Sequence, residues 1–102
     1  MRKFIACLAA VSSLCLSGPP SVAGEMPAMA ARCLPCHGAD GRPALADVPV
    51  IFGQQPIYLA NAIRAYRDGQ RAAGQALVMH ELVKDFSDAE IETLANWLGS
   101  QQ

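Results

Sequence analysis

The stretch Cys33-Leu34-Pro35-Cys36-His37 decides how the rest of the chain is interpreted. Two thiols at this spacing can add to the two vinyl groups of one haem, while the adjacent imidazole reaches the iron. The histidine has to follow the second cysteine directly, because one turn of helix then presents all three groups together. The motif therefore predicts one covalently attached haem c, held by Cys33 and Cys36, with His37 as an iron ligand.

Other uses of the same residues remain open at this point. A thioredoxin-like redox pair needs a βαβ context, and the sequence has no β pattern. A structural zinc site needs four ligands, for which Cys33, Cys36, His37 and His80 are the candidates. A plain disulfide between the two cysteines would close a four-residue loop.

The first 23 residues have the pattern of a secretory signal. Arg2 and Lys3 precede an apolar run of about 13 residues, which is shorter than the roughly 20 that a membrane-spanning helix needs. Small residues at 21–23 suit a signal peptidase. We therefore expect a cleaved signal peptide at 1–23, a periplasmic domain at 24–102 and no stable membrane anchor; an uncleaved anchor is the alternative.

The composition after cleavage limits the possible functions. Loss of Arg2 and Lys3 leaves 6 basic against 9 acidic residues, a net charge of −3. The absence of a basic run or a basic-aromatic stripe argues against nucleic-acid binding. About 79 residues rarely bury enough apolar surface alone and usually need a staple, a metal or a cofactor. A haem at the centre of the domain would meet that need.

The pattern of apolar and breaking residues predicts an all-α domain with three to four helices wrapped around one haem. Helices are expected at 26–33, 56–68 and 87–99, and the last opens with a Ser-x-x-Glu capping box and ends at a glycine. Segment 74–86 is less regular and is expected to hold one or two helical turns. Segment 38–53 is irregular, which suggests that it wraps around something.

The haem iron needs a sixth ligand or an open site. Met26 and Met29 lie too close in sequence to the attachment motif to reach the other face of the haem, so they are interpreted as packing residues. Met79 follows His37 by 42 residues, in a predicted loop that could fold over the haem. Methionine opposite histidine is the pattern of electron carriers, so Met79 is the predicted ligand and His80 the alternative.

These features together resemble the small monohaem class I cytochromes c of bacteria, a short-chain type related to the domains of dihaem cytochromes c. The matching positions beside the haem motif and Met79 are Gly38, Pro49, Ile51, Gly53, Gln54, Tyr58, Leu59, Tyr66, Arg67, Gly69, Ser87, Asp88 and Ile91. The resemblance implies a cytochrome c-like fold in which the Pro49 carbonyl accepts a hydrogen bond from the second ring nitrogen of His37. This chain departs from the family at Phe52, where alanine is common, and at 72–75, which replaces an Asn-Pro segment.

The function implied is one-electron transfer by a soluble periplasmic carrier that is not an enzyme and that works with redox partner proteins. One alternative is a haem-bearing subunit of a larger dehydrogenase, such as a flavocytochrome, with a surface made apolar by Val48 and Phe52. Another is a haem enzyme or sensor with an open iron site. Trp97 is expected to pack against the first helix. The apolar shell expected around the haem is Leu59, Ile63, Leu77, Leu94 and Leu98.

Overall fold

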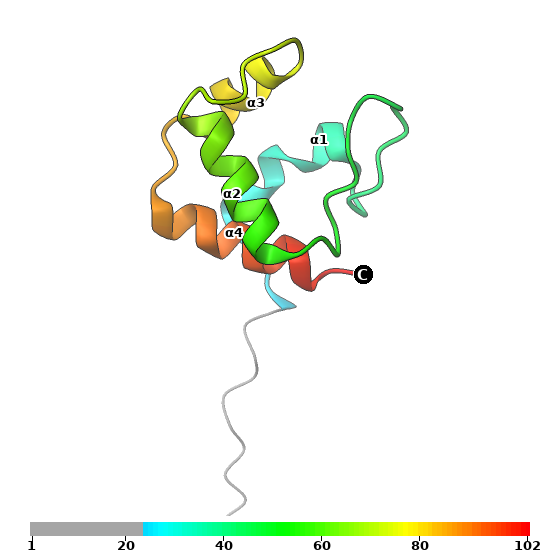
Figure 1. Ribbon diagram of the computed structural model, residues 1–102. Helices are drawn as coiled ribbons and strands as arrows, with labels where there is room; N and C mark the ends of the chain where they lie inside the picture. The colour runs from blue at the N-terminus through cyan, green and yellow to red at the C-terminus, as the bar shows by residue number, and fades with distance from the viewer. Residues whose placement is uncertain (1–23) are drawn as a thin grey trace, which may run out of the picture.

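The computed structural model describes residues 24–102, and all regular secondary structure in that part of the chain is helical. The elements, in chain order, are the 3-10 helix η2 (Ala28–Arg32), α1 (Leu34–His37), α2 (Pro56–Arg67), α3 (Ala76–Val83) and α4 (Asp88–Ser100). Helix α2 packs against both α4 and α3, and α4 crosses beneath it (Figure 1). The all-α prediction is confirmed. The predicted signal peptide lies outside the described residues.

Within those residues, no helix combines the length and the apolar character needed to span a membrane. The buried core is formed mainly where α2 meets α4. It consists of Leu59, Ala60 and Ile63 from α2, Ile91, Leu94, Ala95, Trp97 and Leu98 from α4, and Ala30, Ile51, Val83 and Phe86 from the other segments.

The first predicted helix, at 26–33, is wrong in its bounds. The structure has only the 3-10 helix η2 within this region, with Pro27 in an extended conformation before it; Cys33 then separates η2 from α1, which starts at Leu34. Pro35 explains the division, because proline has no N–H to continue a helix that is already under way but is tolerated in a first turn. The haem motif therefore begins its own short helix.

Segment 74–86 contains about two helical turns, as predicted. Helix α3 covers eight of its residues, so Met79 lies on a helix and not in a loop. The segment Ala76–Val83 contains neither glycine nor proline, so nothing in it interrupts the helix. Gly74, with φ +56°, turns the chain just before it.

The last helix starts as predicted. The Ser87 side chain accepts a hydrogen bond from the Glu90 backbone N–H, and the Glu90 carboxylate accepts one from the Ser87 N–H, both at 3.1 Å. The predicted end at Gly99 is wrong, because α4 continues to Ser100. Gly99 is placed inside the helix, where α4 lies against the start of α2.

The two aromatic residues singled out in the sequence pack against each other. Phe52 and Trp97 meet edge to face, with ring centroids 5.5 Å apart and planes at 89°. Phe52 is partly buried against the core, so only part of its ring remains at the surface. The structure thus gives Trp97 a packing partner in the irregular segment before α2.

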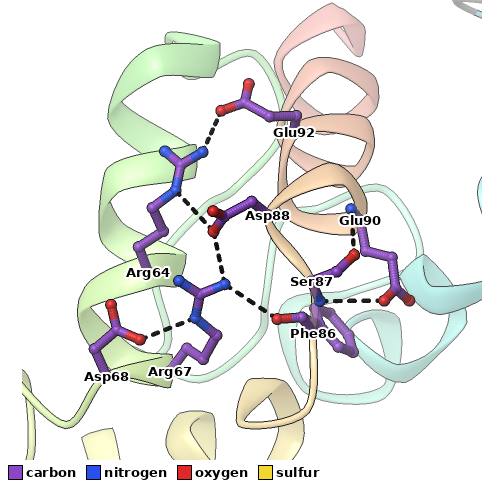
Figure 2. Close-up of polar contacts among 8 residues, drawn as sticks. All are labelled: Arg64, Arg67, Asp68, Phe86, Ser87, Asp88, Glu90 and Glu92. Atoms are coloured by element: carbon purple, nitrogen blue, oxygen red, sulfur yellow. Dashed lines mark hydrogen bonds and ion pairs between the residues drawn. The ribbon is translucent and has the colours of Figure 1, made fainter.

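A network of charged side chains joins α2 to the start of α4 (Figure 2). Arg67 donates to the Asp88 carboxylate at 2.8 Å and to the Phe86 carbonyl at 3.1 Å. Arg64 pairs with Asp88 at 3.6 Å and also with Glu92. Through these contacts the second half of α2 is tied to the first turn of α4.

Asp88→Asn is expected to destabilise the protein near neutral pH and to have little effect in acid. Hydrogen bonding to Arg67, the Arg67 charge and then Arg64 hold the pKa of Asp88 below its ordinary value. The stabilisation is therefore present above the unfolded-state pKa of about 4 and is lost as pH falls through the lower folded-state pKa. Urea unfolding midpoints measured at a series of pH values test this.

Asp85→Asn is the matched control, because Asp85 is exposed in the turn before α4 and forms no ion pair among the described residues. A difference between the Asp88 variant and the unmodified protein that stays constant with pH would contradict the role of the carboxylate charge.

Candidate functional site

One cavity of about 250 Å³ contains all five residues named as site residues from the sequence. Cys33, Cys36 and His37 line it from the segment that includes α1, Pro49 from the irregular segment before α2, and Met79 from α3. Residues up to 46 positions apart in the chain therefore meet around one space. The size is close to the lower end, about 300 Å³, of ordinary small-molecule sites.

The attachment motif is presented by a single turn of backbone. The His37 N–H donates to the Cys33 carbonyl at 2.9 Å, which closes the turn that carries both cysteines and the histidine. Both cysteines are free thiols, with Cys33 half-buried and Cys36 exposed. Burial raises the pKa of the Cys33 thiol, and the neighbouring Arg32 charge opposes that rise.

The orientation of His37 is set by a backbone carbonyl. His37 is buried, and its Nδ1 lies 2.8 Å from the Pro49 carbonyl oxygen. Because a carbonyl can only accept a hydrogen bond, Nδ1 carries the proton and donates it. In the neutral imidazole, Nε2 then keeps its lone pair and can bind a metal.

The segment after α1 can bring Pro49 back to His37 because the backbone turns at Gly38. This residue has φ +86°, and a Cβ built on it would lie 2.5 Å from the Arg42 carbonyl oxygen. Any side chain at this position would be strained and would collide with the backbone. Gly38 thus folds the irregular segment back toward the histidine.

Met79 and its neighbour His80 have different surroundings. Met79 is partly buried and lines the cavity. His80 is absent from the cavity lining, and its Nδ1 donates to the Tyr66 carbonyl at 2.8 Å, so it links α3 to α2. His80 is half-buried and lies on α3. Met26 and Met29 also lie outside the cavity lining, Met26 exposed and Met29 packed on the core.

The apolar walls are largely those expected, with one error. Leu59, Ile63, Leu94 and Leu98 line the cavity, whereas Leu77 is 56% exposed and does not. Leu77 precedes Met79 by two positions, which places the two side chains on nearly opposite faces of α3. Leu82, one turn after Met79, takes the expected place of Leu77. Leu82 was not predicted as a wall residue, because Met79 was expected in a loop and no helix face was assigned to the residues around it.

Val48 and several aromatic residues complete the walls. Val48 was expected at the surface, but it is half-buried and lines the cavity. Tyr58, Tyr66 and Phe86 also line it and were not predicted as wall residues. Leu59, Ile63 and Tyr66 follow one another at spacings of four and three residues, so the three share one face of α2, and this spacing in the sequence predicts a shared buried face.

The donor set fits a haem. Two free thiols, an imidazole with Nε2 available and a thioether converge on an apolar cavity, which is the combination that c-type haem attachment and ligation require. Within residues 24–102, no three side chains of His, Cys, Asp or Glu gather closely enough to hold a metal ion by themselves. The four candidate zinc ligands therefore do not come together there.

Comparison with known proteins gives a consistent result. The family model described as cytochrome c matches residues 21–102. Cytochrome c-554(548) of Halomonas halodenitrificans is 40% identical over 70 residues, which cover 69% of this chain and 84% of that protein. A thiosulfate dehydrogenase electron acceptor of Thiomonas intermedia is 30% identical over 69 residues, 68% of this chain but 32% of that protein. The crystal structure of reduced recombinant cytochrome c4 from Pseudomonas stutzeri superposes with a TM-score of 0.63 at 28% identity, covering 69% of this chain and 38% of that one.

Proposed function

Because this chain belongs to the cytochrome c family, whose members carry covalently bound haem c, we propose that it is a periplasmic one-electron carrier with iron ligated by His37 and Met79. The observation that carries the proposal is the convergence of the attachment motif, Pro49 and Met79 on one apolar cavity. His80, the alternative ligand, is engaged elsewhere by the Tyr66 carbonyl.

Each site residue has a separate part in this function. Cys33 and Cys36 would hold the haem covalently, and Pro49 would keep the His37 ring in one tautomer and one orientation. When bound, the haem supplies one-electron chemistry between ferric and ferrous iron. The leucine and isoleucine walls from α2 and α4 exclude water from the site, and an apolar surround with a thioether ligand favours the ferrous state.

A carrier of this kind meets its partners briefly, through a small interface. Without residues 1–23 the chain carries 6 basic and 9 acidic residues, so a partner with a basic docking surface is favoured. Such an attraction would weaken as salt is added.

A second candidate is a haem-bearing subunit of a larger dehydrogenase. It is favoured by the similarity to a protein named as an electron acceptor of thiosulfate dehydrogenase. Purification from the native host under mild conditions would separate the two: a free carrier elutes alone, whereas a subunit elutes with a dehydrogenase chain.

Absorption and mass spectra of the protein matured in a haem-loading host test the main proposal. We expect a denatured mass equal to the mature polypeptide plus one haem, because thioether bonds survive unfolding. In the ferric state we expect the weak far-red charge-transfer band that marks methionine-ligated haem. A colourless product would refute haem attachment, and a high-spin spectrum without that band would favour an open-site enzyme or sensor.

A further inference from the structure

Among the described residues, some cationic side chains pair with carboxylates and others do not. Arg64, Arg67 and Lys84 each form ion pairs with carboxylates. Arg32 and Arg71 form no ion pair there; each lies over an aromatic ring instead, and both line the cavity. The cavity therefore has two arginines on its wall whose charge is not matched by a protein carboxylate.

Arg71 is held in place by the end of α2. Gly69, at φ +77°, reverses the chain, and the N–H groups of Gln70 and Arg71 then both donate to the Ala65 carbonyl, at 2.9 and 3.2 Å. The Arg71 guanidinium carbon lies 4.5 Å from the centroid of the Tyr66 ring, which lines the same cavity. A guanidinium stacked on a ring keeps the N–H donors at its edge available for an acceptor.

The cofactor of this family supplies such an acceptor. A haem carries two propionate carboxylates on the edge opposite to its vinyl groups. Arg32 is adjacent to Cys33 and so belongs to the vinyl side, whereas Arg71 enters the cavity from the α2–α3 connection. An arginine fork matches a carboxylate in shape and charge.

We infer that Arg71 binds a haem propionate, anchoring the cofactor at the edge opposite to the thioether bonds and raising its reduction potential. The potential rises because a positive charge beside the haem disfavours the ferric state, which carries the additional positive charge. The inference rests on the haem site proposed above. It adds a third kind of cofactor contact to covalent attachment and iron ligation.

Asp47 is the competing acceptor. It is the acidic residue that lines the cavity, and its carboxylate accepts a hydrogen bond from the Gln75 side chain at 3.4 Å. Both partners of that bond are exposed, and neither forms an ion pair or a side-chain hydrogen bond with Arg71 among the described residues. An Asp47 variant therefore belongs in the test.

The test compares the haem-loaded Arg71→Gln and Arg71→Lys variants with Arg42→Gln. Arg42 is exposed and does not line the cavity, so its loss removes the same charge at a distance. For Arg71→Gln we expect a lower potential than for Arg42→Gln. An opposite charge within a few ångströms lowers a carboxyl pKa by about 1 to 3 units. When Arg71 is replaced, the pKa of the propionate should therefore rise by about that amount, and the pH at which the reduction potential begins to change should rise with it. The propionate bending band in resonance Raman spectra should also move, and lysine should restore part of each change.

Two results would overturn the inference. One is an Arg71→Gln protein whose pH profile and propionate band match those of Arg42→Gln. The other is an Asp47→Asn protein that reproduces the Arg71→Gln changes, which would identify Asp47 as the arginine's partner. The far-red charge-transfer band is followed in every variant: its absence from the unmodified protein contradicts the proposed Met79 ligation, while the propionate measurements decide the role of Arg71 separately.

Discussion

Replacing Met79 with alanine is expected to lower the reduction potential by on the order of 0.1 V or more, within the roughly 0.8 V range that axial ligands set. A neutral thioether opposite imidazole favours ferrous iron, so its loss favours the ferric state. The far-red charge-transfer band should disappear, and the iron should become able to bind added cyanide or imidazole. Spectroelectrochemical titration together with ligand titration measures both effects.

His80→Ala is the matched control for this prediction. The two residues are adjacent on α3, but only Met79 lines the cavity, and His80 donates to the Tyr66 carbonyl. The His80 variant should therefore keep the charge-transfer band while losing a link between α2 and α3. The opposite pattern, an unchanged spectrum in Met79→Ala and an altered one in His80→Ala, would make His80 the sixth ligand.

Much of the candidate site could be predicted because its chemistry is concentrated in a short motif. Cys33, Cys36 and His37 are adjacent in sequence, and the requirements of haem attachment fix their order and spacing. Met79 could be named by elimination, since it is the one methionine beyond the first helical region. The contact of His37 with Pro49 spans 12 positions, and only the family resemblance indicated it.

The residues of the cavity wall that were predicted wrongly or not at all lie where tertiary packing determines the structure. The position of the helix within 74–86 decides which residues face the cavity. Because Met79 was expected in a loop, Leu77 was predicted as a wall residue in place of Leu82. Likewise, Arg71 has no local sequence signal of a role. It becomes notable only when its position over the Tyr66 ring and at the cavity wall is seen.

The role of Gly99 in the structure also differs from the role predicted from the sequence. In sequence this glycine has the position of a helix terminator, but it lies inside α4 at the point where this helix meets the start of α2. A Cβ at this position would lie 2.6 Å from Pro56 Cγ and 2.7 Å from the Gln54 carbonyl oxygen. Neither neighbour can move easily, since one is a rigid ring and the other is backbone.

Gly99→Ala is therefore expected to destabilise the protein, by about 1 to 3 kcal/mol as overpacking usually does. The direction of the change in the free energy of unfolding distinguishes a crowded position from an open one, because replacing glycine with alanine inside an unobstructed helix stabilises by roughly 0.5 to 1 kcal/mol. Urea unfolding of the haem-loaded protein, followed by far-UV circular dichroism, measures the change.

Asn96→Ala, at an exposed position of the same helix, is the control and should alter the free energy of unfolding by no more than about 0.5 kcal/mol. A Gly99→Ala protein more stable than the unmodified one would show that α4 and α2 do not meet as closely as described. If it is less stable, the same crossing that limits residue 99 to glycine also sets the position of Leu98, and with it one wall of the cavity. The close contact of the two helices would then be a condition for the shape of the haem site as well as for the fold.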